Sequence, residues 1–100
     1  MARFDVYRSK RSGKLLLEVQ ANAHQLFDTC VVVPLLSVNA ALPNSLPRLH
    51  PRFTIEGAEV RMATHLIAAT MRSDLGVRVT TLEDQAYEIV SALDVLLTGI

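Results

Sequence analysis

The chain has 100 residues, half of them hydrophobic, and this length suits a single domain, residues 1–100, with one buried core. Ten basic and ten acidic residues leave no formal net charge, so the composition shows no basic excess that would favour nucleic acid or a membrane surface as a partner. The single cysteine, Cys30, excludes an intrachain disulfide, and with it the class of disulfide-stapled secreted modules.

Targeting and membrane signals are missing from the sequence. The N-terminus has no apolar signal region, and the longest apolar run, from Cys30 to Leu36, is too short to span a membrane and contains Pro34. We therefore expect a soluble cytoplasmic protein without a membrane partner.

The N-terminal part of the chain predicts a β-hairpin. Apolar and polar residues alternate from Phe4 to Tyr7 and again from Leu15 to Gln20, on either side of a polar tip at residues 9–13. This alternation predicts two half-buried strands and places Glu18 on the face opposite Leu17. Residues 21–28 break the alternation and predict a loop.

The middle of the chain predicts further strands. Residues 29–36 are β-branched and apolar on both faces, so both faces should be covered, and Pro34 should lie at a strand end, a bulge or a sheet edge. Three prolines between residues 43 and 51 exclude a long helix there.

A second hairpin is predicted around Glu56-Gly57, from Phe53 to Leu66, with Leu66 on the buried face and Arg61 and His65 pointing outward. The following segment is ambiguous. Gly76 indicates a turn there, and Val77 and Val79 indicate a last short strand.

A helix is predicted from Leu82 to Leu97. Its apolar residues recur at helical spacing and form one stripe: Ala86, Ile89, Val90, Leu93, Leu96 and Leu97. Thr80 or Thr81 can cap its start, and Gly99 can end it in a left-handed turn. Strands followed by one helix predict an α+β, mostly β domain or small barrel with the helix packed on or beside it.

Few residues suggest catalysis. His24, His50 and His65 are scattered, without metal-ligand spacing, so we expect no metal site and no cofactor. Arg61 and His65 could form a general acid/base pair for RNA cleavage, although a solvated strand face has the same appearance. Cys30 is expected to be a small core residue and not a nucleophile.

Several stretches, in this order and at this spacing, resemble the CcdB family of plasmid and chromosomal toxins over essentially the full length of the chain. They are Phe4–Tyr7, Leu17–Gln20, Val33–Ser37, Leu49-His50-Pro51, Arg61-Met62 and the chain end Gly99-Ile100. The resemblance implies an SH3-like small barrel with an additional short sheet and one long C-terminal helix, assembled as a homodimer.

The resemblance also implies a function. Members of the family poison DNA gyrase by lodging between its two A subunits and trapping the state in which DNA is cut. A cognate antitoxin neutralises them, and the complex with the antitoxin represses its own operon on operator DNA. The resemblance therefore implies the toxin of a type II toxin–antitoxin module, without enzymatic activity.

The residues that contact gyrase in the family lie at the chain end, in the pattern aromatic-Trp-Gly-Ile. Leu97, Thr98, Gly99 and Ile100 occupy these positions here, so Thr98 stands where the family has tryptophan. A stacked cation–π contact contributes about 2 kcal/mol or more when desolvated. Its loss predicts weak binding to gyrase, or none.

Two further positions of the implied gyrase surface also differ. Asp94 replaces an asparagine of the family's helix, and the loop at residues 21–24, with Asn22 and His24, departs from the family pattern. Two alternatives therefore stay open: a ribonuclease toxin on the same barrel, with Arg61 and His65 as its acid/base pair, or a non-toxic homologue that binds antitoxin.

Overall fold

Antiparallel strands and one C-terminal α-helix make up the described part of the chain, residues 2–40 and 42–99 of a computed structural model. The strands are β1 (Asp5–Ser9), β2 (Leu15–Glu18), β3 (Thr29–Ser37), β4 (Arg52–Ile55), β5 (Ala58–Met62), β6 (Ala68–Met71) and β7 (Leu75–Thr81). The α-helix is α1 (Ala86–Thr98), and four 3₁₀ turns are η1 (Asn22–His24), η2 (Thr64–Leu66), η3 (Arg72–Asp74) and η4 (Glu83–Gln85).

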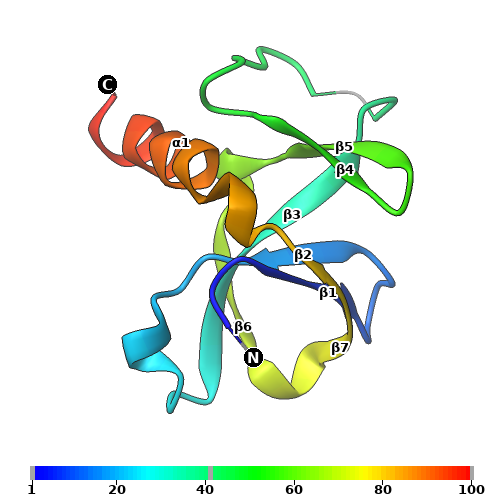
Figure 1. The fold of residues 1–100 in the computed structure, drawn as a ribbon, viewed down its shortest axis with the longest axis vertical. Helices are drawn as coiled ribbons and strands as arrows, with labels where there is room; N and C mark the ends of the chain where they lie inside the picture. Colours follow the sequence, from blue (N-terminus) through cyan, green and yellow to red (C-terminus); the bar gives the residue numbers. More distant parts are fainter. Residues whose placement is uncertain (1, 41, 100) are drawn as a thin grey trace.

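The strands form one seven-stranded sheet in the order β4-β5-β3-β2-β1-β7, with β6 also paired to β3. Figure 1 shows this sheet curled into a half-barrel, with the β4–β5 hairpin projecting from it and α1 crossing beside the hairpin. The expected mostly β barrel-like fold with a C-terminal helix is confirmed.

Strand β3 is the element that the barrel and the hairpin share. Along one edge, residues 29–32 pair with β6 and residues 35–37 pair with β5, while β2 pairs along the other edge. Pro34 lies where the partner changes from β6 to β5, so its missing amide interrupts no ladder on that edge, and its carbonyl accepts a hydrogen bond from Ala63 N.

The helix starts later than the sequence predicts. Residues 83–85 form the 3₁₀ turn η4, whose Glu83 amide donates to Thr81 Oγ1 at 3.2 Å, and α1 begins at Ala86. Gly99 ends it as predicted, with φ 78° and its amide donating to the Val95 carbonyl. In the predicted apolar stripe, Ile89 is buried, whereas Leu97, which the resemblance assigns to the gyrase contact, is 76% exposed.

The main core lies between the sheet and α1. Buried side chains from the barrel, the hairpin and the helix meet there: Val6, Leu17, Val19, Val33, Leu35, Phe53, Ile55, Val60, Met62, Leu82, Ile89 and Ala92. Burial of this continuous apolar surface fixes the helix against the sheet.

The other face of the sheet is also covered, contrary to the prediction of half-buried strands. Tyr7, Cys30, Val32 and Leu75 form a second buried cluster there, and Glu18 is 0% exposed. The sheet curls around this face, so side chains that alternation assigns to solvent are enclosed. The prediction that β3 is covered on both faces is confirmed.

The second hairpin turns where predicted. Glu56 and Gly57 both have positive φ, 51° and 79°, as a two-residue type I′ turn requires. Its second strand ends at Met62 and not at Leu66, because the chain turns into η2 after Ala63. As a result His65 is not on a strand, and Leu66 is exposed where we expected it to be buried.

Gly76 does not form a turn, which corrects the prediction for residues 66–79. It lies inside β7, where an added Cβ would come within 2.5 Å of the Arg8 carbonyl oxygen on β1. Glycine is required there because two strand backbones approach closely.

Among the described residues, α1 and the short 3₁₀ turns lack the length and the apolar composition of a membrane-spanning helix.

Candidate functional site

The predicted contact residues at the chain end lie on the free end of α1, which points away from the barrel in Figure 1. Asp94, Leu97 and Gly99 are exposed. Thr98 is exposed too, and its Oγ1 donates to the Asp94 carbonyl at 2.6 Å within the helix. The remaining expected contact, Ile100, lies outside the described residues.

The two predicted loop residues lie on η1, between β2 and β3. Asn22 Oδ1 accepts a hydrogen bond from the Arg3 amide at 2.7 Å, and the His24 ring stacks on Phe27 with the ring centroids 5.8 Å apart. Figure 1 places this turn well away from the free end of α1. One copy of the chain therefore does not bring Asn22 and His24 into one patch with Asp94 and Leu97.

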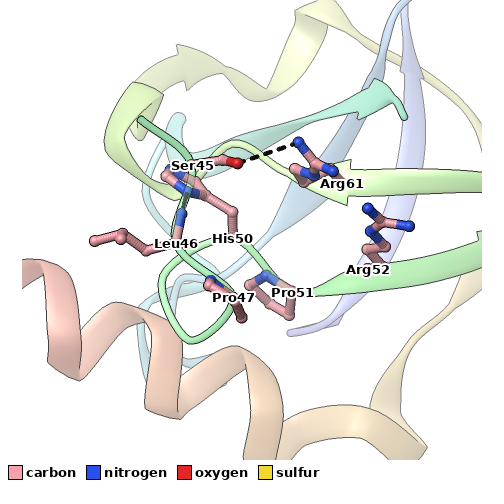
Figure 2. Close-up of a pocket in the computed structure, with 7 residues that line it drawn as sticks. All are labelled: Ser45, Leu46, Pro47, His50, Pro51, Arg52 and Arg61. Carbon is pink, nitrogen blue, oxygen red and sulfur yellow. Dashed lines mark hydrogen bonds between the residues drawn. The ribbon is translucent and has the colours of Figure 1, made fainter. Parts of the chain in front are cut away.

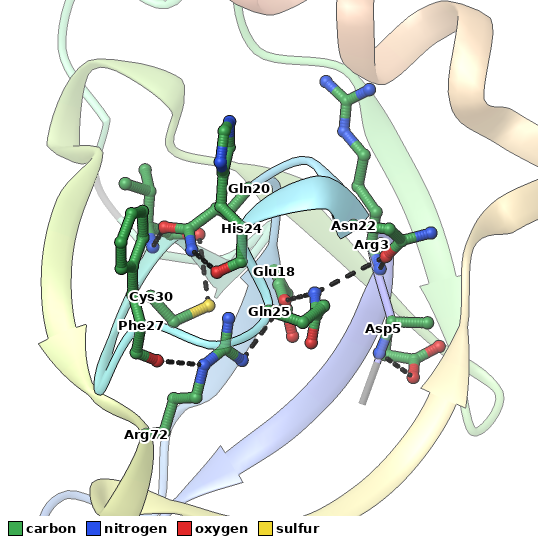
Figure 3. Close-up of polar contacts among 12 residues, drawn as sticks. Arg3, Asp5, Glu18, Gln20, Asn22, His24, Gln25, Phe27, Cys30 and Arg72 are labelled. Carbon is green, nitrogen blue, oxygen red and sulfur yellow. Dashed lines mark hydrogen bonds and ion pairs between the residues drawn. The ribbon is translucent and has the colours of Figure 1, made fainter.

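A buried ion pair, which the sequence did not predict, anchors the η1 loop (Figure 3). Glu18 Oε2 lies 3.4 Å from Arg72 Nη1 and accepts a hydrogen bond from Gln25 Nε2 at 2.8 Å. Arg72 Nε in turn donates to the Phe27 carbonyl at 2.8 Å. Among the described residues, Glu18 Oε1 and Arg72 Nη2 are buried without a hydrogen-bond partner, so the pair is incompletely satisfied.

This buried cluster also determines the protonation state of the Cys30 thiol. Burial, and next to it the charge of Glu18, raises the pKa of the Cys30 thiol to about 12. The thiol is therefore protonated and unreactive at neutral pH, as expected for a core residue.

A second ion pair lies on the same face, between Asp5 Oδ2 and Arg78 Nε at 3.2 Å. Burial favours the protonated carboxyl, but hydrogen bonds from Arg78 and Thr81 and the charge of Arg78 together hold the pKa of Asp5 below its ordinary value. Burial and the neighbouring Asp5 charge raise the pKa of Tyr7 to about 12.

A cavity of about 300 Å³ lies beside the β4–β5 hairpin, and Figure 2 shows its lining. Its walls combine basic, hydroxyl and apolar side chains: Ser45, Leu46, Pro47, His50, Pro51, Arg52 and Arg61. Arg52 and Arg61 are directly opposite each other on β4 and β5, and Arg61 Nη1 donates to Ser45 Oγ at 3.4 Å.

The hydrogen bonds of His50 define its tautomer. Its Nδ1 accepts from the Leu46 amide at 3.0 Å, so the ring proton is on Nε2, which lies 2.9 Å from His65 Nδ1 and donates to it. Burial, followed by the charges of His65 and Arg61, lowers the pKa of His50. His50 is therefore neutral at pH 7 and holds the loop before β4 against η2.

The predicted pair of Arg61 and His65 is corrected by this arrangement. The two residues do not share a strand face, since β5 ends at Met62 and His65 is in η2. They are linked through His50, which contacts His65 and lines the cavity together with Arg61. The sequence signal for His50 and Arg52 was weak, because a single histidine and a strand-edge arginine are common on any surface.

Within residues 2–40 and 42–99, no group of three or more histidine, cysteine, aspartate or glutamate side chains could hold a metal ion. The cavity therefore offers cationic and neutral donors without acidic ligands.

The chain matches the family described as CcdB protein over residues 3–99. The chain belongs to the CcdB family. Members of this family are toxins of type II toxin–antitoxin modules, so the match fixes the class of protein, and it extends to the exposed end of α1. No curated protein matches the chain significantly.

Solved structures with a similar fold include a mycobacterial endoribonuclease and a toxin of Mycobacterium tuberculosis. An endoribonuclease in complex with its cognate antitoxin, from a mycobacterial species, superposes with a TM-score of 0.78 at 19% identity, covering 97% of this chain and 94% of that one. The Mycobacterium tuberculosis toxin MazF-mt6 gives a TM-score of 0.72 at 10% identity, with 90% and 92% covered. At these identities the likeness shows that this chain and these proteins have a similar fold, and no more.

Proposed function

We propose that this CcdB-family toxin acts by binding the A subunits of DNA gyrase through the free end of α1, without enzymatic activity of its own. The observation that carries the proposal is the family match reaching residue 99, at a helix end where Asp94 and Leu97 are exposed. The binding is weaker than is typical of the family, since Thr98 offers no ring to stack on an arginine. Asp94 contributes little in exchange, because exposed ion pairs stabilise weakly.

Trapping of gyrase-cleaved plasmid tests this proposal. The unmodified protein should trap little cleaved DNA, and Thr98→Trp should increase trapping, by about thirtyfold for a desolvated stacking contact. Tyr87→Trp is the matched control, because Tyr87 is 82% exposed at the other end of the same helix. Strong trapping by the unmodified protein would contradict the assigned role of Thr98. If Thr98→Trp traps no cleaved DNA, the end of α1 is not the surface that contacts gyrase.

We further propose that the protein is a homodimer, since this arrangement would combine two helix ends into one surface. The family match supports the dimer, because the resemblance to CcdB toxins implies a homodimer. Sedimentation should show a species of twice the 11.0 kDa chain mass. A single 11.0 kDa species at micromolar concentration would exclude the dimer.

A cognate antitoxin is the second proposed partner, with operator DNA bound only by the complex. The family match supports this, and one of the solved structures with this fold is of an endoribonuclease held by its cognate antitoxin. The test is co-expression with the product of the neighbouring reading frame, which should co-purify and confer binding to DNA from upstream of the two genes. DNA binding by the toxin alone would contradict the proposal.

Ribonuclease activity is a second candidate function, favoured by the contact of His50 with His65 beside Arg61. His65 is exposed and receives its hydrogen bond on Nδ1, which leaves its Nε2 proton directed away from His50. A neutral imidazole in this state can donate a hydrogen bond to negative charge that develops on a phosphate, together with Arg61.

Cleavage of a mixed RNA substrate tests the second candidate. His65→Ala and Arg61→Ala should abolish cleavage, while His24→Ala, which changes an exposed histidine on η1, should leave it intact. Absence of cleavage by the unmodified protein excludes the ribonuclease. If gyrase trapping by Thr98→Trp is absent as well, the protein is a non-toxic homologue that binds antitoxin.

A further inference from the structure

Two arginines face each other across the β4–β5 hairpin. Arg52 and Arg61 are direct cross-strand partners in the antiparallel register, and both line the cavity of Figure 2. Like charges in this position destabilise a hairpin. A folded protein keeps such a pair at a cost, unless an opposite charge compensates it.

Neither arginine forms an ion pair with a carboxylate in the described residues. The ion pairs found there involve Arg8, Arg11, Arg72 and Arg78. The side chain of Arg61 donates a hydrogen bond to the hydroxyl oxygen of Ser45. Burial lowers the pKa of His50, and so does the charge of Arg61; with two guanidinium groups in its lining, the cavity has a positive local potential.

The shape of the cavity suits an anion that carries an apolar or planar group. Its volume of about 300 Å³ matches the lower end of small-molecule sites. Polar groups enter from the loop at Ser45, from β4 and from β5, while Leu46, Pro47 and Pro51 supply an apolar wall. Donors from three elements fit a tetrahedral anion with oxygens in several directions, whereas a planar carboxylate is satisfied by a single guanidinium fork.

We propose that this cavity binds the phosphate group of a nucleotide, free or within a polynucleotide, with Arg52 and Arg61 as its main ligands. Ser45 Oγ is free to rotate and donate to a phosphate oxygen, and the sugar or base lies against Pro47 and Pro51. The inference deepens the ribonuclease candidate by adding Arg52 and Ser45 to its phosphate site. It stands without that candidate, because binding is measurable where cleavage is absent.

Titration calorimetry at constant ionic strength tests the site with adenosine 5′-monophosphate, adenosine, inorganic phosphate and a short single-stranded oligonucleotide. The monophosphate should bind and adenosine should not. Arg52→Gln and Arg61→Gln should each weaken binding by about tenfold or more. Arg48→Gln is the matched control, because this exposed arginine is on the same loop but does not line the cavity.

Each result decides for or against the proposal. Binding of the oligonucleotide with the same dependence on Arg52 and Arg61 assigns the site to a polynucleotide, and binding of the monophosphate alone assigns it to free nucleotides. Equal binding of adenosine, equal weakening by Arg48→Gln, or no binding of any phosphate compound overturns the proposal. Tighter binding of an acidic peptide than of the monophosphate would make the site a carboxylate site and would also overturn it.

The variants themselves need a folding control. Circular dichroism of Arg52→Gln and Arg61→Gln should match the unmodified protein. If either fails to fold, Arg52→Lys and Arg61→Lys keep the charge while removing the guanidinium fork, and they should still weaken binding. Monophosphate binding without RNA cleavage would support the phosphate site and reject the ribonuclease.

Discussion

Arginine is used in two opposite ways on the sheet of this protein. Arg72 is paired with the buried carboxylate of Glu18 and has lost most of its contact with water, with its side chain 14% exposed. Arg52 on β4 and Arg61 on β5 face each other at a surface cavity and have no acidic partner in the described residues. A buried charge requires a partner, because desolvation costs several kcal/mol, whereas a surface charge can stay uncompensated.

The two pairs differ in where their partners lie. The Glu18–Arg72 pair holds the η1 loop through Gln25 and the Phe27 carbonyl, so its partners are all internal. The Arg52–Arg61 pair has no acidic partner in the described residues, and the proposed phosphate ligand would supply the opposite charge from outside the chain.

The largest effect is expected from Glu18→Ala. It leaves Arg72 buried without its carboxylate, and the free energy of unfolding should fall by about 3–5 kcal/mol, measured by urea denaturation. The matched control is Glu56→Ala, which removes an exposed pair with Arg8 at the same 3.4 Å separation. This control should change stability by less than about 1 kcal/mol. Equal losses in the two variants would contradict the contrast.

A smaller loss is expected on acidification through His50. Its pKa is lowered in the folded state below the ordinary 6.5, so the unfolded chain takes up a proton first as the pH falls. The contribution of neutral His50 to the free energy of unfolding should therefore be fully present above about pH 6.5 and should be lost as the pH falls below that value. Asp5, whose pKa is also lowered, contributes only further down, near its ordinary 3.8.

Urea denaturation at about pH 7.5 and pH 5.5 measures the histidine effect. His50→Asn should reduce the loss between the two values, while His24→Asn, at an exposed histidine, should not. A loss of the same size in His50→Asn would assign the pH dependence to other groups.

The smallest effect, and the one of opposite sign, is expected from Arg52→Gln. Removing one of two facing cations should raise the free energy of unfolding by about 0.2–1 kcal/mol, and added salt should reduce the gain by screening. Arg48→Gln, which has no cross-strand cation, should show no such gain. A loss of stability in Arg52→Gln would mean that the arginine has a structural partner and is not held for a ligand.

Much of the fold follows from local signals in the sequence. Neighbouring residues determine three features, so pattern alone predicts them. These are the turn with positive φ at Glu56 and Gly57, the left-handed Gly99, and the alternation along β1 and β2. The late start of α1 and the end of β5 at Met62 depend on competing 3₁₀ turns, which have no strong sequence signal.

The candidate sites were less predictable. Alternation placed Glu18 opposite Leu17 correctly but could not show that the sheet curls over that face and buries it. The partner Arg72 is 54 residues away in the chain, and no local pattern connects the two. The cavity likewise combines the loop before β4 with two strands, so His50 and Arg61 meet only through the tertiary fold.

Strand β3 connects the barrel and the hairpin, because both are hydrogen-bonded to it. Because its two halves pair with β6 and β5 in turn, neither the barrel nor the hairpin can detach without breaking hydrogen bonds to the same continuous backbone. The two parts should therefore open as one cooperative unit, and their slowest amide protons should exchange with similar free energies of opening. Earlier exchange throughout β4 and β5 would show that the hairpin opens separately. If the two parts open together, a ligand held by Arg52 on that hairpin slows exchange in the barrel as well as at its own site.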